Sequence, residues 1–395
     1  MNRASAAMGS VAHLPAGSSQ CPYLVVRDPE AVRDILHRPA EFSPANALIA
    51  VTPIAGPALR VLQSVRFALP PVLASNDTGS HAGIRKVVGS FFTPAKVAAM
   101  EPRIRELARA AAAQAAGQLG RSGQADLVQS VAAFTPAIVM LEFLGLPVRD
   151  LPALKRWGLD SMELFWGWPD GDRQLELAGS AAGFYTWLRE LVGESVGAPG
   201  RNLFKSLHDH GLSTPEICSL GYFLLIAGQE TTTQLISTTL FRLLEGTGPV
   251  TWAEAADEES ARSMVWHVLA TESSVPTWRR VSAQDATVAG HAIPAGAEIL
   301  LELTGTHDLP GEQEEDLTLL AGTARRRRPT AYGLVFGSGI HRCLGARLAE
   351  LEATVIVQET AAALPQARLR DHEPDWIRHL SFQAPKTVTV TAGKV

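Results

Sequence analysis

One segment of this 395-residue chain leaves little choice about the fold. It runs from Pro215 to Glu245 and reads PEICSLGYFLLIAGQETTTQLISTTLFRLLE. We expect a single helix, capped by Thr214 and ended by Gly246, because proline suits a first turn and glycine suits a helix end. At 1.5 Å per residue the helix would be roughly 45 Å long. Apolar side chains surround most of it, so it should run through the core.

The centre of this predicted helix breaks the rules that its ends obey. Residues 227–233 read AGQETTT, with a glycine, a glutamate and three threonines where the core should be apolar. A glycine costs about 1 kcal/mol in a helix interior, and a buried glutamate needs a partner. Such a conflict in mid-core indicates either a functional site or a buried polar network with a purely structural role.

A second unusual stretch, GSGIHRCLG at residues 337–345, places a cysteine among glycines. A helix should follow it, because apolar residues recur on one face at Leu344, Leu348, Leu351 and Val355. Cys343 then lies at a helix N-terminus, where free N–H groups lower the pKa of a thiol. The glycines allow the backbone to approach a flat or bulky group closely.

The residues around Cys343 permit three roles for its sulfur. Cys21 and Cys218 are far away in the sequence, so neither a disulfide framework nor a zinc site with four protein ligands is indicated. A lone thiolate on a glycine-rich loop before a helix suits an axial ligand of haem iron. The alternatives are a catalytic nucleophile with His341 as its base, or a small buried apolar side chain.

Both motifs together resemble one family. Residues 336–345, FGSGIHRCLG, look like the cysteine loop of the cytochrome P-450 superfamily, and residues 227–232, AGQETT, resemble the oxygen-binding segment of its long central helix. The resemblance implies a mainly α fold with small β-sheets, formed by residues 1–395 as a single domain. It also implies haem b between the long central helix and the helix that follows the cysteine loop.

The same resemblance assigns roles to individual residues. Cys343 would be the iron ligand, and Glu230 and Thr231 would relay protons to bound dioxygen. The residues that would contact haem are His81, Arg85, Ala227, Gly228, Arg280, Phe336, Gly337, His341, Cys343 and Gly345. Four of them are basic and come from three distant segments, as two buried haem carboxylates require.

Family position also indicates a substrate pocket of apolar and aromatic residues. Its expected members are Phe67, Leu69, Trp166, Trp168, Phe223, Val275, Thr277 and Phe382. Ordinary core packing would explain each of them equally well.

The chain departs from the family at a support for the cysteine loop. A Glu-x-x-Arg pair is usual there, but the matching positions hold His267 and Ala270, and Glu272 is out of register. Losing both members of a buried ion pair is tolerable where other packing replaces them. We hypothesise that one arginine of Arg325–Arg328 partly restores the network, while the others steer an acidic ferredoxin.

Composition limits the partners and the location. The net charge is −5, without the basic excess of a nucleic-acid-binding protein. The sequence contains no uninterrupted run of about 18 apolar residues, so no membrane-spanning helix is predicted. The N-terminal segment lacks the apolar block of a signal peptide, so we expect a cytoplasmic protein.

Local patterns predict further elements. Helices are expected at residues 101–120 and from residue 126 to the Gly-Leu-Pro that ends at residue 147. Strands are expected at residues 23–26, 47–56 and 386–392, with a hairpin at residues 285–303.

The function implied is a haem-dependent monooxygenase that uses O2 to oxidise a small organic substrate, such as a secondary metabolite or a carrier-protein-bound group. Its electrons would come from NAD(P)H through a ferredoxin reductase and a ferredoxin. The alternative is a haem-free helper subunit of a partner such as a glycosyltransferase. The missing Glu-x-x-Arg pair favours the helper, whereas Cys343, Glu230, Thr231, Arg280 and His341 together favour the enzyme.

Overall fold

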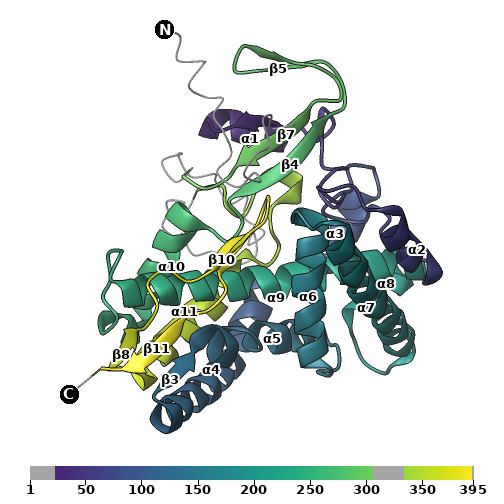
Figure 1. Ribbon diagram of the computed structural model, residues 1–395. Helices are drawn as coiled ribbons and strands as arrows, with labels where there is room; N and C mark the ends of the chain where they lie inside the picture. The colour runs from purple at the N-terminus through teal and green to yellow at the C-terminus, as the bar shows by residue number, and fades with distance from the viewer. Residues whose placement is uncertain (1–22, 306–332, 394–395) are drawn as a thin grey trace, which may run out of the picture.

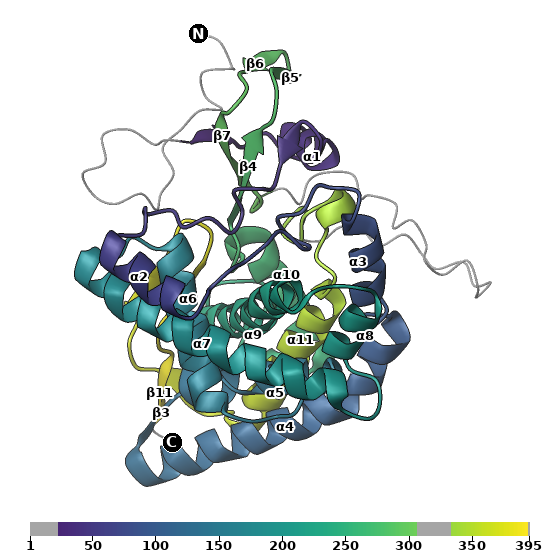
Figure 2. The same ribbon diagram turned by 90° about the vertical axis from the view of Figure 1, so that its right-hand side faces the viewer.

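The computed structural model describes residues 23–305 and 333–393 (Figure 1). The predicted long helix is α9, Thr214–Glu245, and it lies in the middle of the molecule (Figures 1 and 2). Ser213, not Thr214, is its cap residue. The Glu216 carboxylate reaches back to accept hydrogen bonds from the Ser213 N–H and hydroxyl at 2.8 and 2.6 Å, which places the cap one residue earlier than expected.

Six helices pack around α9 and bury most of its surface. They are α5 (Thr135–Phe143), α6 (Leu151–Trp166), α7 (Gly171–Gly197), α8 (Leu203–Asp209), α10 (Glu258–Glu272) and α11 (Ala346–Ala363). Outside this layer lie α1 (Pro29–His37), α2 (Gly56–Ser64), α3 (His81–Gly89) and α4 (Pro94–Ser122). The predicted mainly α architecture is therefore confirmed.

Helix α4 is longer than the predicted helix at residues 101–120. Thr93 caps its first turn, Pro102 lies inside it, and Gly123 ends it with a φ of +73°. The glycine at the predicted end, Gly120, stays helical, because a helix ends where the chain adopts the left-handed conformation rather than at every glycine. The helix predicted from residue 126 is also interrupted: strand β3 (Gln124–Asp126) and a π-helical turn (Val128–Ala132) precede α5.

The strands form small sheets at the two ends of the helical body. The largest sheet has the order β1 (Leu24–Val26), β7 (Glu298–Glu302), β4 (Thr277–Ser282) and β2 (Phe42–Ser43). A second sheet has the order β3, β11 (Thr389–Ala392) and β8 (Ala367–Leu369). Strands β9 (Trp376–Arg378) and β10 (Gln383–Pro385) form one two-stranded sheet. Strands β5 (Ala286–Val288) and β6 (His291–Ile293) form another.

The predicted first and last strands are confirmed as β1 and β11, and the predicted hairpin forms as β5–β6. After that hairpin, β7 runs parallel to β1 and antiparallel to β4. Ile299 of β7 therefore pairs with Leu24 of β1 on one side and with Arg280 of β4 on the other. This register fixes the place of Arg280 in the largest sheet.

The strand predicted at residues 47–56 is wrong. The guanidinium of Arg279 donates to the carbonyl oxygens of Ala47 and Ile49, and the N–H of Val51 donates to the carbonyl of Phe165. A side chain and the last turn of α6 thus take the hydrogen bonds that a neighbouring strand would have supplied.

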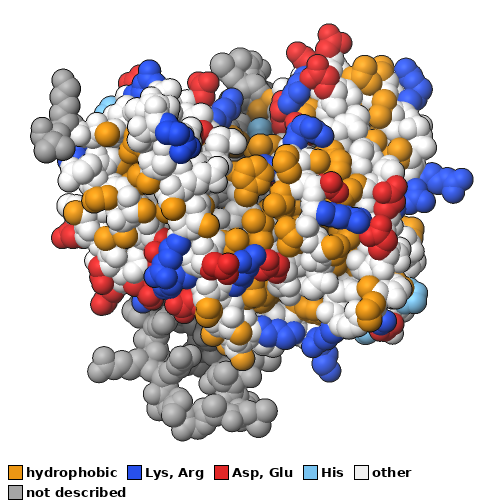
Figure 3. Space-filling model, turned by 90° about the horizontal axis from the view of Figure 1, so that it is seen from below, with side chains coloured by type: hydrophobic (Ala, Val, Ile, Leu, Met, Phe, Trp, Pro, Cys, Tyr) orange, Lys and Arg blue, Asp and Glu red, His pale blue; other side chains and the backbone are white. Residues whose placement is uncertain are grey.

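The surface carries charges of both signs. On the face in Figure 3, acidic and basic side chains lie near one another, around a central group of apolar side chains. Within the two described ranges, no helix has both the length and the apolar character needed to cross a membrane. Residues Arg325–Arg328, for which we hypothesised a stabilising role, lie outside the described residues.

Candidate functional site

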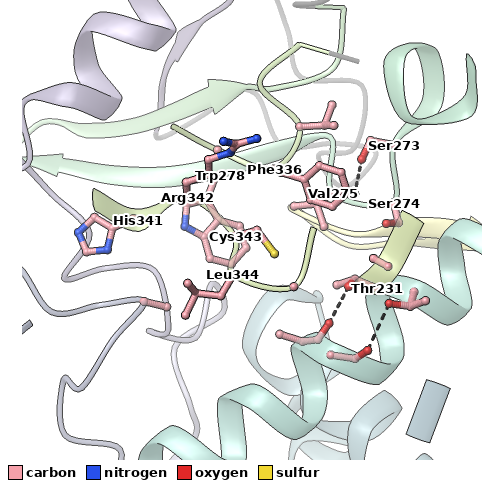
Figure 4. A pocket seen from close by; sticks show the side chains of 18 of the residues that line it. Thr231, Ser273, Ser274, Val275, Trp278, Phe336, His341, Arg342, Cys343 and Leu344 are labelled. Atoms are coloured by element: carbon pink, nitrogen blue, oxygen red, sulfur yellow. Dashed lines mark hydrogen bonds between the residues drawn. The ribbon is translucent and has the colours of Figure 1, made fainter. Parts of the chain in front are cut away.

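A cavity of about 240 Å³ separates the middle of α9 from the cysteine loop (Figure 4). It receives residues from α3, α6, α9, β4 and α11, from the segment between α10 and β4, and from the turn before β10. The sequence-predicted cofactor residues that line it are Arg85, Ala227, Gly228, Arg280, Phe336, Gly337, His341, Cys343 and Gly345.

The cysteine loop is closed by its own backbone. The N–H of Cys343 donates to the carbonyl of Phe336 at 2.8 Å, and Gly337 and Gly339 adopt φ values of +71° and +66°. A Cβ at Gly339 would lie 2.9 Å from the Leu36 carbonyl oxygen, so α1 can approach the loop only at a glycine. The glycines therefore let the loop turn back and pack against α1.

The sulfur of Cys343 faces the cavity. Figure 4 shows it pointing toward the side where α9 carries Thr231, whereas His341 lies on the opposite side. Burial raises the pKa of the thiol, while N–H groups of Gly345 and Ala346 and the charge of Arg85 lower it. The loop thus provides donors for a thiolate, and a positively charged ligand on the sulfur would complete its stabilisation.

Two helices hold the cysteine loop from outside. Arg85 of α3 donates to the Arg342 carbonyl oxygen at 2.6 Å. The Nε2 of His37, the last residue of α1, lies 2.6 Å from the Ser338 hydroxyl. These contacts come from the N-terminal third of the chain, and sequence reasoning identified only Arg85 among them.

The helix that usually provides the Glu-x-x-Arg pair makes different contacts here. Trp266 of α10 donates from its indole N–H to a Glu350 carboxylate oxygen on α11 at 3.1 Å. Glu272 instead pairs with both sides of the Arg242 guanidinium at 2.6 and 2.7 Å. The out-of-register glutamate therefore ties α10 to α9 and not to the cysteine loop.

Basic side chains with unused hydrogen-bonding capacity cluster beside the cysteine loop. The rings of His81 and His341 lie 4.6 Å apart, and both ring nitrogens of His341 and the Nε2 of His81 are buried without a hydrogen-bond partner in the described part of the chain. Arg280 is 2% exposed, and its guanidinium donates to the carbonyl of Arg279. Burial lowers the pKa of Arg280 to about 10 and that of His341 to about 3.

These groups fit the two carboxylates of haem. Arg85, Arg280 and His341 line the cavity, and His81 packs against the His341 ring; three ring nitrogens of these two histidines have no partner in the described part of the chain. Buried donors of this kind are costly unless an acceptor arrives, and two carboxylates would supply both acceptors and negative charge. A single thiolate at the other edge of the same space would then ligate the iron.

Thr231 lies on the opposite wall of the cavity. Its hydroxyl donates to the Ala227 carbonyl oxygen, one turn earlier in α9, at 2.6 Å. At Gly228, a Cβ would lie 1.9 Å from the Cε of Met140, which also lines the cavity. Gly228 therefore allows α5 to pack closely on α9.

Glu230 does not line the cavity. Its side chain is fully buried on another side of α9, where Oε2 lies 2.8 Å from the Nζ of Lys155 on α6. Lys155 also donates to the Thr233 hydroxyl at 3.1 Å. A Cβ at Gly158 would lie 2.7 Å from the Glu230 Oε1, so α6 makes room for this carboxylate. The structure thus separates Glu230 from Thr231, although the two are neighbours in sequence.

Half of the expected substrate pocket lines the cavity, namely Trp166, Phe223, Val275 and Phe382. The other four residues pack elsewhere. The Phe67 ring lies 5.0 Å from the Tyr185 ring, Trp168 packs against Leu300 and Leu380, and the Thr277 hydroxyl donates to the Leu380 carbonyl oxygen at 2.7 Å.

Leu69 packs against the main core instead of facing the cavity. Sequence reasoning assigned it together with Phe67 and Trp168 by family position, and loops carry side chains in directions that such a position does not determine.

Sequence reasoning also missed residues of the cavity. Glu352 of α11 lines it, is 1% exposed, and has an Oε2 without a hydrogen-bond partner in the described ranges. A signal existed, because a glutamate here interrupts the apolar face formed by Leu348 and Val355. Met140 gave no signal, since it lies within an apolar run of a buried helix.

Comparisons with known proteins agree in pointing to one family. The chain is 32% identical over 311 residues to the vitamin D(3) 25-hydroxylase of Pseudonocardia autotrophica, covering 76% of this chain and 72% of the relative. It is 30% identical over 315 residues to the cytochrome P-450 monooxygenase PikC of Streptomyces venezuelae, covering 78% and 72%. The erythromycin C-12 hydroxylase of Saccharopolyspora erythraea is 29% identical over 319 residues, covering 78% and 77%.

Among solved structures, the cytochrome P-450 CREJ in complex with (4-ethylphenyl) dihydrogen phosphate superposes with a TM-score of 0.82. Its sequence identity is 26%, and the match covers 95% of this chain and 93% of that one. No protein-family model matches the chain.

Proposed function

This chain belongs to the cytochrome P-450 family, and from that premise we propose that it is a haem-thiolate monooxygenase with Cys343 as its iron ligand. The observation that carries the proposal is the Cys343 thiol, which faces an apolar cavity beside four converging basic side chains. Named relatives are hydroxylases and monooxygenases, so the haem-free helper is not favoured.

The cofactor of this proposal is haem b. His81, Arg85, Arg280 and His341 would bind its carboxylates, and Phe336, Gly337 and Gly345 would flank the sulfur. When bound, a haem-thiolate iron activates O2, so that one oxygen atom enters the substrate and the other leaves as water. The protein has to bind the substrate, exclude bulk water and deliver protons.

Proton delivery is assigned to Thr231 and Glu230. Thr231 has its hydroxyl at the cavity, where it can donate once its hydrogen bond to the Ala227 carbonyl is exchanged. Glu230 is bound to Lys155 outside the cavity. A proton that Glu230 carries can reach Thr231 only when the carboxylate rotates away from Lys155 or when water connects the two groups.

The electrons come from redox partners, as in the family. We assign their source to NAD(P)H and their route to a ferredoxin reductase and a ferredoxin, in the cytoplasm. Oxidation of an organic substrate by O2 with water as second product consumes two electrons and two protons, so a supply of both is required.

The substrate is a small organic molecule. We propose a secondary metabolite, free or bound to a carrier protein, because a relative of similar length is named for hydroxylation of erythromycin. An apolar cavity with few polar groups suits such a molecule.

The test is the absorption spectrum of the purified protein. A strongly red-shifted Soret band of the ferrous-CO form is expected, since it reports a thiolate on haem iron. A protein that binds no haem after reconstitution would contradict the monooxygenase assignment and favour the helper subunit.

A further inference from the structure

The cysteine loop, residues 336–345, needs contacts from outside to hold one shape. Three of its ten residues are glycine. Glycine loses more conformational freedom on ordering than any other residue, so fixing this loop has a large entropic cost. The tip of the loop is also open to solvent, with Ile340 45% exposed. The hydrogen bond from the Cys343 N–H to the Phe336 carbonyl closes the loop, but it does not attach the loop to the rest of the protein.

One of the outside contacts comes from the N-terminal helix. The Nε2 of His37, the last residue of α1, lies 2.6 Å from the hydroxyl of Ser338, which is 0% exposed. The contact from α3 holds the loop at the Arg342 carbonyl. His341, a proposed cofactor contact, lies between these two attachment points, and Cys343 directly follows the second. Both residues therefore depend on the two contacts for their positions.

Helix α1 is a firm base for such a contact. Its residues Val32, Ile35 and Leu36 are buried and belong to one apolar cluster with Leu334, which lies just before the cysteine loop. Leu36 also lines the cavity, and its carbonyl oxygen lies close to Gly339 of the loop. Helix and loop are thus packed together on both sides of the hydrogen bond, so the bond joins two groups that are already close.

Helix α10, which usually carries the Glu-x-x-Arg support, is tied elsewhere in this chain. Glu272 pairs with Arg242 of α9, and Trp266 donates to Glu350 of α11. The contacts of the cysteine loop with α1 and α3 therefore carry more of its support here than they would beside an intact Glu-x-x-Arg pair.

We propose that His37 is a positioning residue for the cysteine loop, which it holds through the Ser338 hydroxyl so that Cys343 and His341 keep their places. An imidazole nitrogen can donate to a hydroxyl or accept from it, so the bond can form with either tautomer of His37. That the bond also prolongs the retention of haem is the part of this inference that rests on the proposed function.

The first test measures the loop itself by hydrogen–deuterium exchange on the full chain, both haem-loaded and as the apoprotein. The N–H groups of Gly337, Arg342 and Cys343 are hydrogen-bonded within or beside the loop, so a peptide covering residues 334–345 reports its opening. We expect His37→Ala and Ser338→Ala each to speed this exchange about fivefold, as the loss of one net hydrogen bond allows. Exchange within α11 should stay unchanged.

The second test measures the proposed iron ligand on the haem-loaded chain. Haem transfer to apomyoglobin should be about fivefold faster in both alanine variants, and a larger share of the ferrous-CO form should lack the red-shifted band that reports a thiolate. The double variant of His37 and Ser338 should be no worse than either single variant, because all three lack the same bond.

Conservative replacements separate positioning from a general effect on α1. His37→Gln should restore slow exchange and slow haem transfer, because its amide reaches about as far as Nε2, whereas the shorter His37→Asn should behave like His37→Ala. The matched control is Arg38→Gln, which removes the ion pairs with Asp34 and Glu41 from the same end of α1 and should leave the loop unchanged.

Three results would each overturn the inference: wild-type exchange of the loop in His37→Ala, equal acceleration in Arg38→Gln, or failure of His37→Gln to restore the loop. If His37→Ala folds poorly, the comparison of His37→Gln with His37→Asn still decides. The ferrous-CO spectrum of the wild type tests the proposed function separately. Faster loop exchange in variants of a chain that binds no haem would support the role of His37 and contradict only the monooxygenase assignment.

Discussion

The wall of the cavity that carries Cys343 is crowded with basic side chains, whereas the wall near α9 has no charged side chain among the described residues that line it. On the first wall, the Arg280 guanidinium and the ring nitrogens of His341 are buried without an acidic partner in the two described ranges. On the second, the polar groups are the hydroxyls of threonine and serine side chains and the indole N–H groups of Trp166 and Trp278. One wall carries buried basic groups, and the other carries no charge among the described residues that line it.

This difference separates two kinds of recognition. A cofactor has one fixed shape and charge, so its wall can be built from a few charged residues in a fixed arrangement. A substrate wall needs shape and few polar contacts, and many aromatic and aliphatic combinations satisfy it. Four substitutions test whether the two walls are as independent as this division implies.

The largest effect is expected at the sulfur. Cys343→Ala removes the proposed iron ligand, so the red-shifted ferrous-CO band and monooxygenase activity should both disappear. The control is Cys218→Ala, because Cys218 is buried in α9 away from the cavity and should leave the band intact. Retention of a red-shifted band in Cys343→Ala would remove the cysteine loop from the iron site.

Arg280→Leu should act in opposite directions on the apoprotein and the holoprotein. Removing one partner of a buried charge pair costs about 2–5 kcal/mol, so haem affinity should fall by at least about thirtyfold, measured by haem transfer to apomyoglobin.

Without haem, the same substitution removes a buried cation whose acceptor in the described structure is a backbone carbonyl. The apoprotein should therefore unfold at a higher denaturant concentration than the wild-type apoprotein. A destabilised apoprotein would mean that Arg280 stabilises the fold rather than the cofactor.

Glu352→Gln should change how stability depends on pH. Burial raises the pKa of Glu352 well above its ordinary value of 4.5, so above that pH the folded protein holds a proton that the unfolded chain releases. The free energy of unfolding of the wild-type apoprotein should therefore fall as the pH rises from about 4.5. The variant should flatten this slope and gain about 1–3 kcal/mol at neutral pH.

Glu359 on the same helix provides the control of opposite sign. Burial opposes ionisation there, but hydrogen bonds from Arg109 and Arg105 outweigh it and lower the pKa of Glu359. Glu359→Gln should therefore destabilise the protein at neutral pH and much less below the lowered pKa. The free energy of unfolding is measured by urea unfolding at a series of pH values. The same pH dependence in both variants would contradict the assignment.

The smallest effect is expected on the other wall. Thr231→Ala should leave haem content and the ferrous-CO band unchanged, but the fraction of electrons that end in product should fall about fivefold to tenfold. The measurement compares NAD(P)H consumed with product formed. Thr231→Ser should restore most of the coupling.

Thr239→Ala is the matched control for Thr231. The Thr239 hydroxyl also bonds to a carbonyl one turn earlier in α9, that of Leu235, but Thr239 does not line the cavity. Coupling that falls equally in both variants would mean that the loss comes from the helix and not from the cavity.

The difference between the cysteine-loop wall and the α9 wall of the cavity also explains which features could be predicted from the sequence. The sequence motifs allowed the meeting of Cys343, Arg85, Arg280 and His341 at one cavity to be predicted, because each motif has a fixed spacing and a particular residue type; their roles toward a cofactor stay predictions. Helix α9 was predictable because its length and apolar surface allow few alternatives.

The substrate wall was predictable only in part. Trp166 and Phe382 line the cavity, but Trp168 turns away although it is only two residues from Trp166. The orientation of Glu230 was also hidden, because its partner Lys155 lies 75 residues away in sequence. Pairings of this kind depend on how helices pack, and no local pattern reports them.

The four basic side chains that face the cofactor end of the cavity have a consequence for how the protein is made. His81 and Arg85 emerge early during synthesis, Arg280 emerges much later, and His341 and Cys343 lie near the end of the chain. Contacts between such distant segments form slowly, because long loops must close first. With these residues as its proposed ligands, the cofactor can be captured only after the chain has been synthesised at least as far as Cys343, so haem content would depend on folding as well as on affinity.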